Sequence, residues 1–203
     1  MPEIVTAPYL LFFVAVASYL LGSIPFGLVI IRLMGLGDLR QIGSGNIGAT
    51  NVLRTGSKPA ALATVLLDAG KGGIAVLLAR IFIGEDAAQL AGLAAFIGHI
   101  FPVWLNFNGG KGVATYLGTL LALSFFAGFA ACMTWLAVAL VFRISSLAAL
   151  VAAALMPLWL NLMGLPSYII LTALLGALIW MRHADNIRRI LGGTEKKIQL
   201  KKG

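Results

Sequence analysis

A glycine-rich segment from Gly43 to Arg54 carries the residue types best suited to bind a phosphate group. It reads Gly-Ser-Gly-Asn-Ile-Gly-Ala-Thr-Asn-Val-Leu-Arg. Three glycines within six positions allow successive backbone N–H groups to point into one concavity, and the Ser, Thr and Asn side chains add hydrogen-bond partners around it. Arg54 adds a cation that pairs well with phosphate. The segment lacks the Gly-Lys-Ser/Thr end of a Walker A loop, which argues against nucleotide hydrolysis, and a flexible turn between helices is the alternative interpretation.

A second polar segment runs from Asn106 to Thr115 and reads Asn-Phe-Asn-Gly-Gly-Lys-Gly-Val-Ala-Thr. It places Lys111 between glycines at the start of an apolar stretch, where an ammonium group and the positive end of a helix dipole act on the same anion. A lysine beside a membrane is often only an anchor at the cytoplasmic surface. The flanking glycines favour anion binding, because an anchor has no need of a backbone without side chains.

The third polar segment, Arg182 to Gly193, follows the last apolar stretch. In a helix, His183 and Asn186 are three residues apart and lie on one face, as do Arg182 and Asn186 at four. Histidine accepts a proton or hydrogen-bonds an anion near neutral pH. The alternative is a basic tail on anionic lipid, which we expect for the lysines between Lys196 and Lys202.

The remaining ionisable residues predict structure more than chemistry. Asp68 and Lys71 are three apart inside an apolar stretch, and we expect them to form a structural ion pair. His99 is expected to be a packing residue, and Cys132 a small core residue. With one cysteine and two widely separated histidines, the sequence predicts no metal site.

Composition identifies the environment in which these segments lie. Of 203 residues, 60% are hydrophobic and 11% are charged, and the mean hydropathy is +0.98. A soluble domain carries roughly a quarter charged residues, so these values exclude a soluble enzyme, a disordered tail and a soluble nucleic-acid binder. The chain is therefore expected to be an integral membrane protein, and its net charge of +8 must face anionic lipid or an anionic substrate.

Long apolar runs predict the helices that position the polar segments. A helix that crosses the hydrocarbon needs about 20 apolar residues. The run from Gly112 to Phe142 would form a helix of about 46 Å, too long for one crossing, so we divide it near Ser124. The sequence thus predicts an all-α protein of about seven transmembrane helices. The apolar runs are Pro8 to Ile31, Pro59 to Ala79, Ala87 to Leu105, the two halves of Gly112 to Phe142, Ser146 to Leu160 and Ser167 to Met181.

The positive charges predict the orientation of the chain. With seven crossings, every Lys and Arg except Arg80 and Lys71 falls on one side of the membrane. Since cytoplasmic loops hold the excess of positive charge, the N-terminus is expected outside and the C-terminus in the cytoplasm. All three polar segments then face the cytoplasm. The first residues have no basic region typical of a signal peptide, and we expect one integral domain over residues 1–203.

Together, the three segments resemble the cytoplasmic motifs of the bacterial acyl-phosphate:glycerol-3-phosphate acyltransferases. The residues that carry the resemblance are Ser44 to Asn51 with Arg54, Gly109 to Thr115, and His183 with Asn186 to Arg188. The resemblance covers nearly the whole chain. It implies an enzyme of the bacterial inner membrane, with its active site on the cytoplasmic face. The enzyme would move a fatty acyl group from acyl phosphate to the first hydroxyl of glycerol 3-phosphate, giving lysophosphatidic acid and phosphate.

The third motif departs from the family pattern. The family commonly has His-Arg-Glu-Asn where this chain has His183-Ala184-Asp185-Asn186. The missing arginine and the shortened acid put a role for positions 184 and 185 in doubt, whereas His183 and Asn186 match. The chain also lacks the His-x4-Asp pattern of acyltransferases that depend on acyl carrier protein.

From the resemblance and the chemistry of the residues we predict two phosphate sites and no cofactor. The phosphate of acyl phosphate is expected at Ser44, Gly45, Asn46, Gly48, Ala49 and Thr50. Glycerol 3-phosphate is expected at Asn51, Arg54, Lys111, His183 and Asn186. The catalytic residues would be Ser44, His183 and Asn186, with His183 acting either as a general base or only by orienting the attacking hydroxyl. Membrane lipid and a soluble enzyme that produces acyl phosphate are the expected partners, and no nucleic acid is expected.

Two other classes of protein fit parts of the pattern. A small transporter of an anionic solute would also use glycines and intramembrane charge, but its polar groups should lie near the middle of the membrane and often occur in an inverted repeat. Here the polar residues lie on one side and no repeat is visible. A lipid-binding scaffold without catalytic activity is the other alternative.

Overall fold

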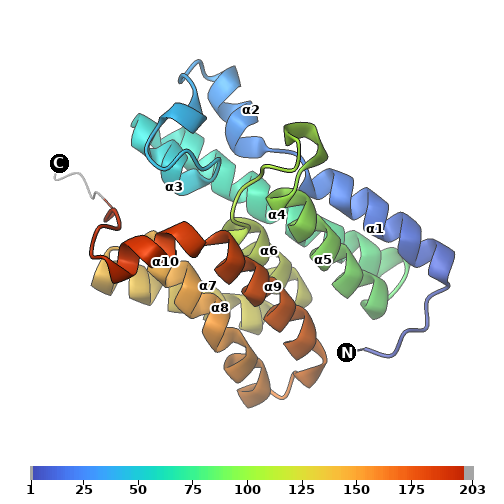
Figure 1. Ribbon diagram of the computed structural model, residues 1–203. Helices are drawn as coiled ribbons and strands as arrows, with labels where there is room; N and C mark the ends of the chain where they lie inside the picture. Colours follow the sequence, from blue (N-terminus) through green and yellow to red (C-terminus); the bar gives the residue numbers. More distant parts are fainter. Residues whose placement is uncertain (1, 199–203) are drawn as a thin grey trace. The chain divides into compact units, whose positions relative to one another are not determined.

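Each apolar run of the sequence forms helix in the computed structural model, which describes residues 2–198. Over this range the chain contains helices and connections but no strand, so the expected all-α class is confirmed (Figure 1). The α-helices are α1 (Pro8–Gly22), α2 (Phe26–Leu33), α3 (Ala49–Val52), α4 (Lys58–Phe82), α5 (Glu85–Ile100), α6 (Val113–Leu123), α7 (Phe125–Phe142), α8 (Ser145–Leu162), α9 (Ile169–Arg182) and α10 (Ala184–Leu191). The 3-10 turns are Leu39–Gln41, Leu53–Thr55, Val103–Leu105 and Pro166–Tyr168.

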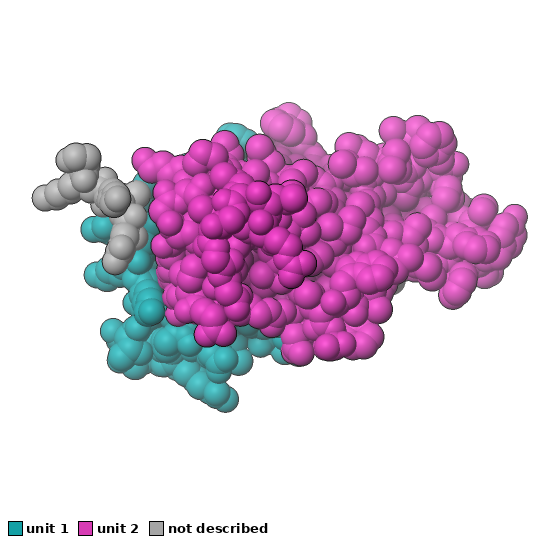
Figure 2. Space-filling model, turned by 90° about the horizontal axis from the view of Figure 1, so that it is seen from above, with its two compact units in different colours: residues 1, 129–203 teal, residues 2–128 magenta. Residues whose placement is uncertain are grey.

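The described residues pack into two compact units, residues 2–128 and residues 129–198 (Figure 2). The boundary between them falls inside α7. The first two polar segments belong to the first unit and the third belongs to the second unit. One domain over residues 1–203 stays a prediction, and Lys201 and Lys202 of the predicted basic tail lie outside the described residues.

Small residues allow the helices of the first unit to approach closely. In this unit α1 packs on α5, and α4 packs on both α5 and α6. A Cβ added at Gly98 of α5 would overlap the carbonyl of Tyr19, and one added at Gly118 of α6 would overlap the carbonyl of Ala69. Close packing through small residues is typical of membrane helices, which gain nothing by hiding apolar surface from lipid. Large apolar side chains such as Phe12 and Phe126 accordingly remain exposed.

By length and composition, fewer helices qualify as membrane crossings than the seven predicted. Five helical stretches are long and apolar enough to cross, and a sixth counts if Pro166–Arg182 and Ala184–Leu191, bent by 64°, form one crossing. The difference lies in α6, which has 11 residues and is therefore about 16 Å long. A helix of that length is shorter than a hydrocarbon layer of about 30 Å, so the seventh crossing stays a prediction.

Two breaks shape the helices. The predicted division near Ser124 is confirmed, because α6 ends at Leu123, Ser124 is extended and α7 begins at Phe125. The first run, Pro8 to Ile31, was expected to be continuous but is interrupted between α1 and α2. Pro25 lies in this interruption, where it lacks the N–H that a continuous helix would use.

Candidate active site

The glycine-rich segment is a loop that ends in a single helical turn. Gly43 and Gly45 have φ of 59° and 68°, a left-handed conformation that favours glycine. Gly48 then precedes α3, so Thr50 and Asn51 lie in a helical turn. The prediction that successive backbone N–H groups of this loop point into a phosphate-binding concavity does not hold for Ser44 and Gly45. The N–H of Ser44 donates to Asn51 Oδ1 at 3.2 Å and the N–H of Gly45 donates to the Ile42 carbonyl at 2.9 Å, so both serve the loop itself.

Asn51 is the centre of this loop. Its side chain is buried, with 1% of the residue exposed. The amide nitrogen donates to the carbonyls of Leu39 at 3.0 Å and Ile42 at 2.9 Å. The amide oxygen accepts from the N–H of Ser44 and from Nη1 of Arg54 at 3.1 Å. The hydrogen-bonding capacity of the amide is thus used within the protein, and the geometry assigns Asn51 to hold the loop together.

Arg54 and Ser44 lie next to each other at the surface. Both are exposed, and both donate to the same oxygen of Asn51, Arg54 with Nη1 and Ser44 with its backbone N–H. The Arg54 side chain also crosses close to Gly43, where a Cβ would meet its Cδ and Nη1 at 2.6 Å. Arg54 and Ser44, residues of types suited to bind phosphate, are therefore neighbours at the surface.

The other residues expected at acyl phosphate follow in the same loop. Asn46, Gly48 and Ala49 are half-buried, and Thr50 is exposed. The carbonyl of Gly48 accepts the N–H groups of Asn51 and Val52, which fixes the turn. A role for these residues at a phosphate stays a prediction.

The second polar segment rests on the end of α5. The N–H of Gly109 donates to the Ile100 carbonyl at 3.3 Å, and the N–H of Gly110 donates to the His99 carbonyl at 3.1 Å. Gly112 has φ of 82° and lies against the ring of Phe96, where a side chain would not fit. Lys111, half-buried, therefore stands one residue before the cap of α6, beside the positive end of that helix's dipole.

A hydrogen bond that the sequence did not predict links the two loops of the first unit. Nη2 of Arg40 donates to the carbonyl of Asn108 at 3.1 Å, and the side chain of Asp38 accepts from the Arg40 N–H at 2.9 Å. Both loops therefore lie at the same end of this unit (Figure 1). The sequence offered no signal for Arg40 beyond its charge, because its partner is a backbone atom far along the chain.

In the second unit, His183 lies at the bend between α9 and α10. It is 3% exposed, and its Nδ1 lies 2.7 Å from the carbonyl of Ile179. A carbonyl oxygen only accepts, so Nδ1 carries the proton and, in the neutral ring, the lone pair lies on Nε2. This tautomer is suited to accept a hydrogen bond or a proton from a hydroxyl.

Asn186, also buried, is held by an acid that the sequence did not single out. Its Nδ2 donates to Oε1 of Glu195, which also accepts from Oγ of Ser146 at 2.8 Å. The other carboxylate oxygen accepts from Nε of Arg189 at 2.6 Å. Burial by itself would raise the pKa of Glu195, but the hydrogen bonds from Arg189, Ser146 and Asn186 outweigh it and hold that pKa below its usual value.

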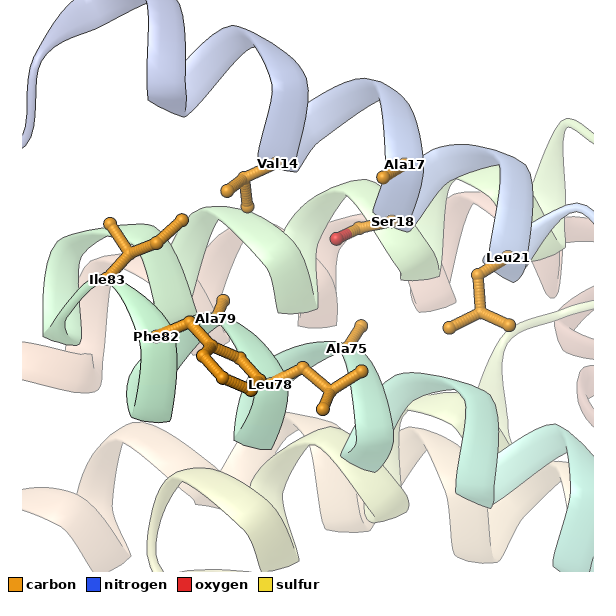
Figure 3. A pocket seen from close by; sticks show the side chains of 9 residues that line it. All are labelled: Val14, Ala17, Ser18, Leu21, Ala75, Leu78, Ala79, Phe82 and Ile83. Atoms are coloured by element: carbon orange, nitrogen blue, oxygen red, sulfur yellow. The ribbon is translucent and has the colours of Figure 1, made fainter.

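An apolar groove of about 250 Å³ lies between α1 and α4 (Figure 3). Val14 and Leu21 line it from α1, Ala75 and Phe82 line it from α4, and Ser18 is the polar residue among the side chains that surround it. Because none of these side chains is charged, the groove does not fit a phosphate group.

The comparisons with known proteins assign the chain to a family. The family model described as glycerol-3-phosphate acyltransferase matches residues 12–193. The chain belongs to this family. A glycerol-3-phosphate acyltransferase of Dinoroseobacter shibae is 63% identical over 202 residues, which cover 100% of both chains. One from Cereibacter sphaeroides (strain ATCC 17025) is 62% identical over 198 residues, 98% of this chain and 94% of the relative.

Solved structures of a relative agree with the fold. The crystal structure of PlsY (YgiH), an integral membrane glycerol 3-phosphate acyltransferase, in its glycerol 3-phosphate form has a TM-score of 0.88 and 41% identity, covering 93% of this chain and 96% of that one. Its lysophosphatidic acid form has a TM-score of 0.86 and 40% identity, covering 92% and 94%. As a family member, the chain is a membrane-embedded acyltransferase. The family match includes all three polar segments, and the comparisons favour the enzyme over the transporter and scaffold hypotheses.

Proposed function

We propose that the protein transfers a fatty acyl group from acyl phosphate to the sn-1 hydroxyl of glycerol 3-phosphate. The observation that carries this proposal is the bond from Arg40 to Asn108, which links the loop of Lys111 to the segment just before the loop of Ser44 and Arg54 at one end of the first unit. Both substrates carry a phosphate group, and such a set of donors and cations binds phosphate without a metal. The relatives named glycerol-3-phosphate acyltransferase support the acceptor substrate.

The reaction needs binding and orientation more than strong activation. The hydroxyl oxygen forms a bond to the carbonyl carbon, the bond from that carbon to the phosphate oxygen breaks, and lysophosphatidic acid and phosphate leave. Phosphate is a good leaving group, so the main requirement is to hold both reactants in a reactive geometry. The proton of the hydroxyl passes either to His183 or to a phosphate oxygen of a substrate.

Each polar segment has its own task in this proposal. Arg54 and Lys111 bind the phosphate of glycerol 3-phosphate, and the Ser44 hydroxyl with the loop that follows it binds the phosphate of acyl phosphate. In this proposal His183 accepts a hydrogen bond from the attacking hydroxyl through Nε2, and Asn186 orients the acceptor. The acyl chain remains in the lipid throughout.

The cellular setting follows from charge and hydropathy. We infer an enzyme of the bacterial inner membrane with about seven crossings, an N-terminus outside and the three polar segments facing the cytoplasm, because the Lys and Arg residues gather on that side. Glycerol 3-phosphate then arrives from the cytoplasm. The reaction requires a supply of acyl phosphate, and a soluble enzyme that makes it is the expected partner.

Purified protein supplied with acyl phosphate and labelled glycerol 3-phosphate tests the proposal. We expect labelled lysophosphatidic acid and one released phosphate per acyl transfer. Lys111→Ala should raise the KM for glycerol 3-phosphate more than the KM for acyl phosphate, whereas Lys58→Ala, a matched change at an exposed lysine, should leave both unchanged.

Two results would contradict the proposal. A folded protein that forms no product would return the transporter hypothesis to first place. Equal increases of both KM values in Lys111→Ala would contradict the division of labour between the two phosphate sites.

A further inference from the structure

A buried cluster of ionisable side chains lies against the loop that carries Lys111. Asp68 and Lys71 of α4 form an ion pair with 2.8 Å between Oδ1 and Nζ. Nδ1 of His99, near the end of α5, lies 3.6 Å from the same Oδ1. All three residues are buried, at 2%, 2% and 5% exposure. None of its residues belongs to the three polar segments, so the proposed reaction does not yet assign the cluster a role.

The loop is built directly on His99. The carbonyls of His99 and Ile100 lie in the last turn of α5, where they have no partner within the helix, and they accept the N–H groups of Gly110 and Gly109. A Cβ added at Gly110 would overlap Nε2 of the His99 ring. The Gly110 backbone therefore rests on the imidazole, and Lys111 is the next residue along the chain.

The ion pair in turn holds the ring. The Asp68 carboxylate lies between Nζ of Lys71 and Nδ1 of His99, so it restricts the orientation of the imidazole. Lys71 also donates to the carbonyl of Ile24 at 2.8 Å and lies 5.7 Å from the centre of the Phe26 ring. These bonds connect the break between α1 and α2, the middle of α4 and the end of α5.

Burying these three ionisable side chains costs free energy, so a role beyond packing would explain their presence. Buried charges inside a membrane helix lose their hydration, and ion pairs of this kind are often no more stabilising than apolar residues of the same size. Packing α4 against α5 does not require it, since these helices already approach closely at Gly92 of α5, where a Cβ would lie 3.1 Å from Val76 of α4. The cluster instead fixes the His99 ring against the Gly110 backbone, and so limits where that backbone can lie.

We propose that His99, held in place by Asp68 and Lys71, is a positioning residue for Lys111. The ring sets the height of the Gly110 backbone, and thereby where the Lys111 ammonium meets the phosphate of glycerol 3-phosphate. The inference rests on the proposed function of Lys111 and adds a residue that acts through it.

The first experiment separates positioning from packing by kinetics. His99→Ala should raise the KM for glycerol 3-phosphate by roughly tenfold to a hundredfold, because displacements near 1 Å cost about that much in well-ordered sites. The KM for acyl phosphate should change by less than about threefold, since the segment expected to bind it, Ser44 to Thr50, is a different loop from the one that rests on His99. His99→Gln, whose side-chain amide reaches toward Gly110, should restore most of the affinity for glycerol 3-phosphate.

The second experiment is a double-mutant cycle between the ring and the loop. Gly110→Ala alone places a methyl group on the His99 ring and should raise the same KM. In the His99→Ala background the methyl group fills the space that the ring has left, so the second substitution should cost much less than the first. Gly70→Ala is the matched control, because a Cβ at Gly70 has no neighbour within 4 Å.

The possible outcomes separate this inference from the proposed function. Equal increases of both KM values in His99→Ala, no rescue in His99→Gln, or additive effects in the cycle would make His99 a packing residue and overturn the inference. If Lys111→Ala raises the KM for glycerol 3-phosphate while His99→Ala and Gly110→Ala do not, only the inference fails. If Lys111→Ala itself leaves that KM unchanged, the proposed function of Lys111 fails.

Discussion

Replacing Asn51 with aspartate tests whether this amide holds the glycine-rich loop in its binding conformation. Aspartate has the same size, but it presents an oxygen where Nδ2 donates to the carbonyls of Leu39 and Ile42. Three oxygens then face one another without a proton between them. On the other side of the group, the bonds from the Ser44 N–H and Arg54 to the remaining oxygen persist.

The cost follows from these contacts. Each lost hydrogen bond contributes about 1 kcal/mol, and a buried carbonyl without a partner costs about 1–3 kcal/mol. The Leu39 residue is fully buried, so its carbonyl gains little from water. The new charge attracts Arg54, but Arg54 is exposed and such a pair contributes less than about 1 kcal/mol. The loop should therefore lose about 2–3 kcal/mol, which lowers the ratio of its ordered to its disordered form by roughly 30-fold to 150-fold.

Kinetics and hydrogen exchange together measure this loss. We expect kcat/KM to fall by roughly tenfold to a hundredfold, and amides between residues 39 and 54 to exchange faster. Asn161→Asp is the matched control, because it makes the same chemical change at an exposed position outside the loop and should retain activity. An Asn51→Asp protein with wild-type kcat/KM and unchanged exchange would refute the assignment of Asn51 as the residue that holds the loop.

Four further predictions concern separate parts of the molecule. Ser44→Ala should lower the rate without lowering the melting temperature, because Ser44 is exposed; loss of expression would instead indicate a structural turn. In His183→Ala, the part of the pH–rate profile that reports deprotonation of a catalytic base should disappear if His183 takes the proton. If His183 only orients the hydroxyl, the profile should keep its shape at a lower rate. Gly118→Ala should push α6 from α4 at a cost of about 1–3 kcal/mol and lower the melting temperature by about 3–10 °C, whereas an equal drop in Gly70→Ala would contradict the packing argument. Because the pKa of Glu195 is lowered in the folded protein, its stabilising effect is present above pH 4.5 and disappears as pH falls through the lowered value; Glu195→Gln should be less stable than wild type at pH 7 and equal to it in acid, and a gap that persists in acid would contradict this.

The three polar segments could be found from sequence because their chemistry is local. Glycine next to Ser, Lys and Asn is unusual in a chain of this hydropathy, and short-range geometry predicts donors there. The tasks of individual residues in these segments depended on distant partners. The sequence predicts that Asn51 binds glycerol 3-phosphate, whereas in the structure its amide makes four hydrogen bonds within the protein. No local pattern predicts the roles of Arg40 and Glu195, since their partners are a backbone carbonyl and side chains distant in the sequence.

For the helices, too, the sequence predicts some features and only the structure shows others. Apolar runs predicted where helix forms, and the turn residue Ser124 marked a real break. The first half of the divided run forms α6 almost as predicted, and the helix starts at Val113 because Gly112 adopts a left-handed conformation at its cap. Hydropathy also does not predict the break near Pro25, because an uncharged run satisfies a hydropathy criterion whether or not its helix is continuous.

By itself, the sequence determined the solvent and the chemistry of this protein. Hydropathy requires lipid, charge asymmetry predicts an orientation, and three glycine-, lysine- and histidine-containing segments predict phosphate chemistry, because each property depends on residue type and short spacing. Only the tertiary structure decided which side chains support and which face outward. In the sequence, Asp68 and Lys71 form a simple pair three residues apart, and His99 lies about 30 residues further along the chain. Only the packing of α4 against α5 brings the three together beside Gly110. Long-range contacts carry no local pattern, so the fold alone places that support.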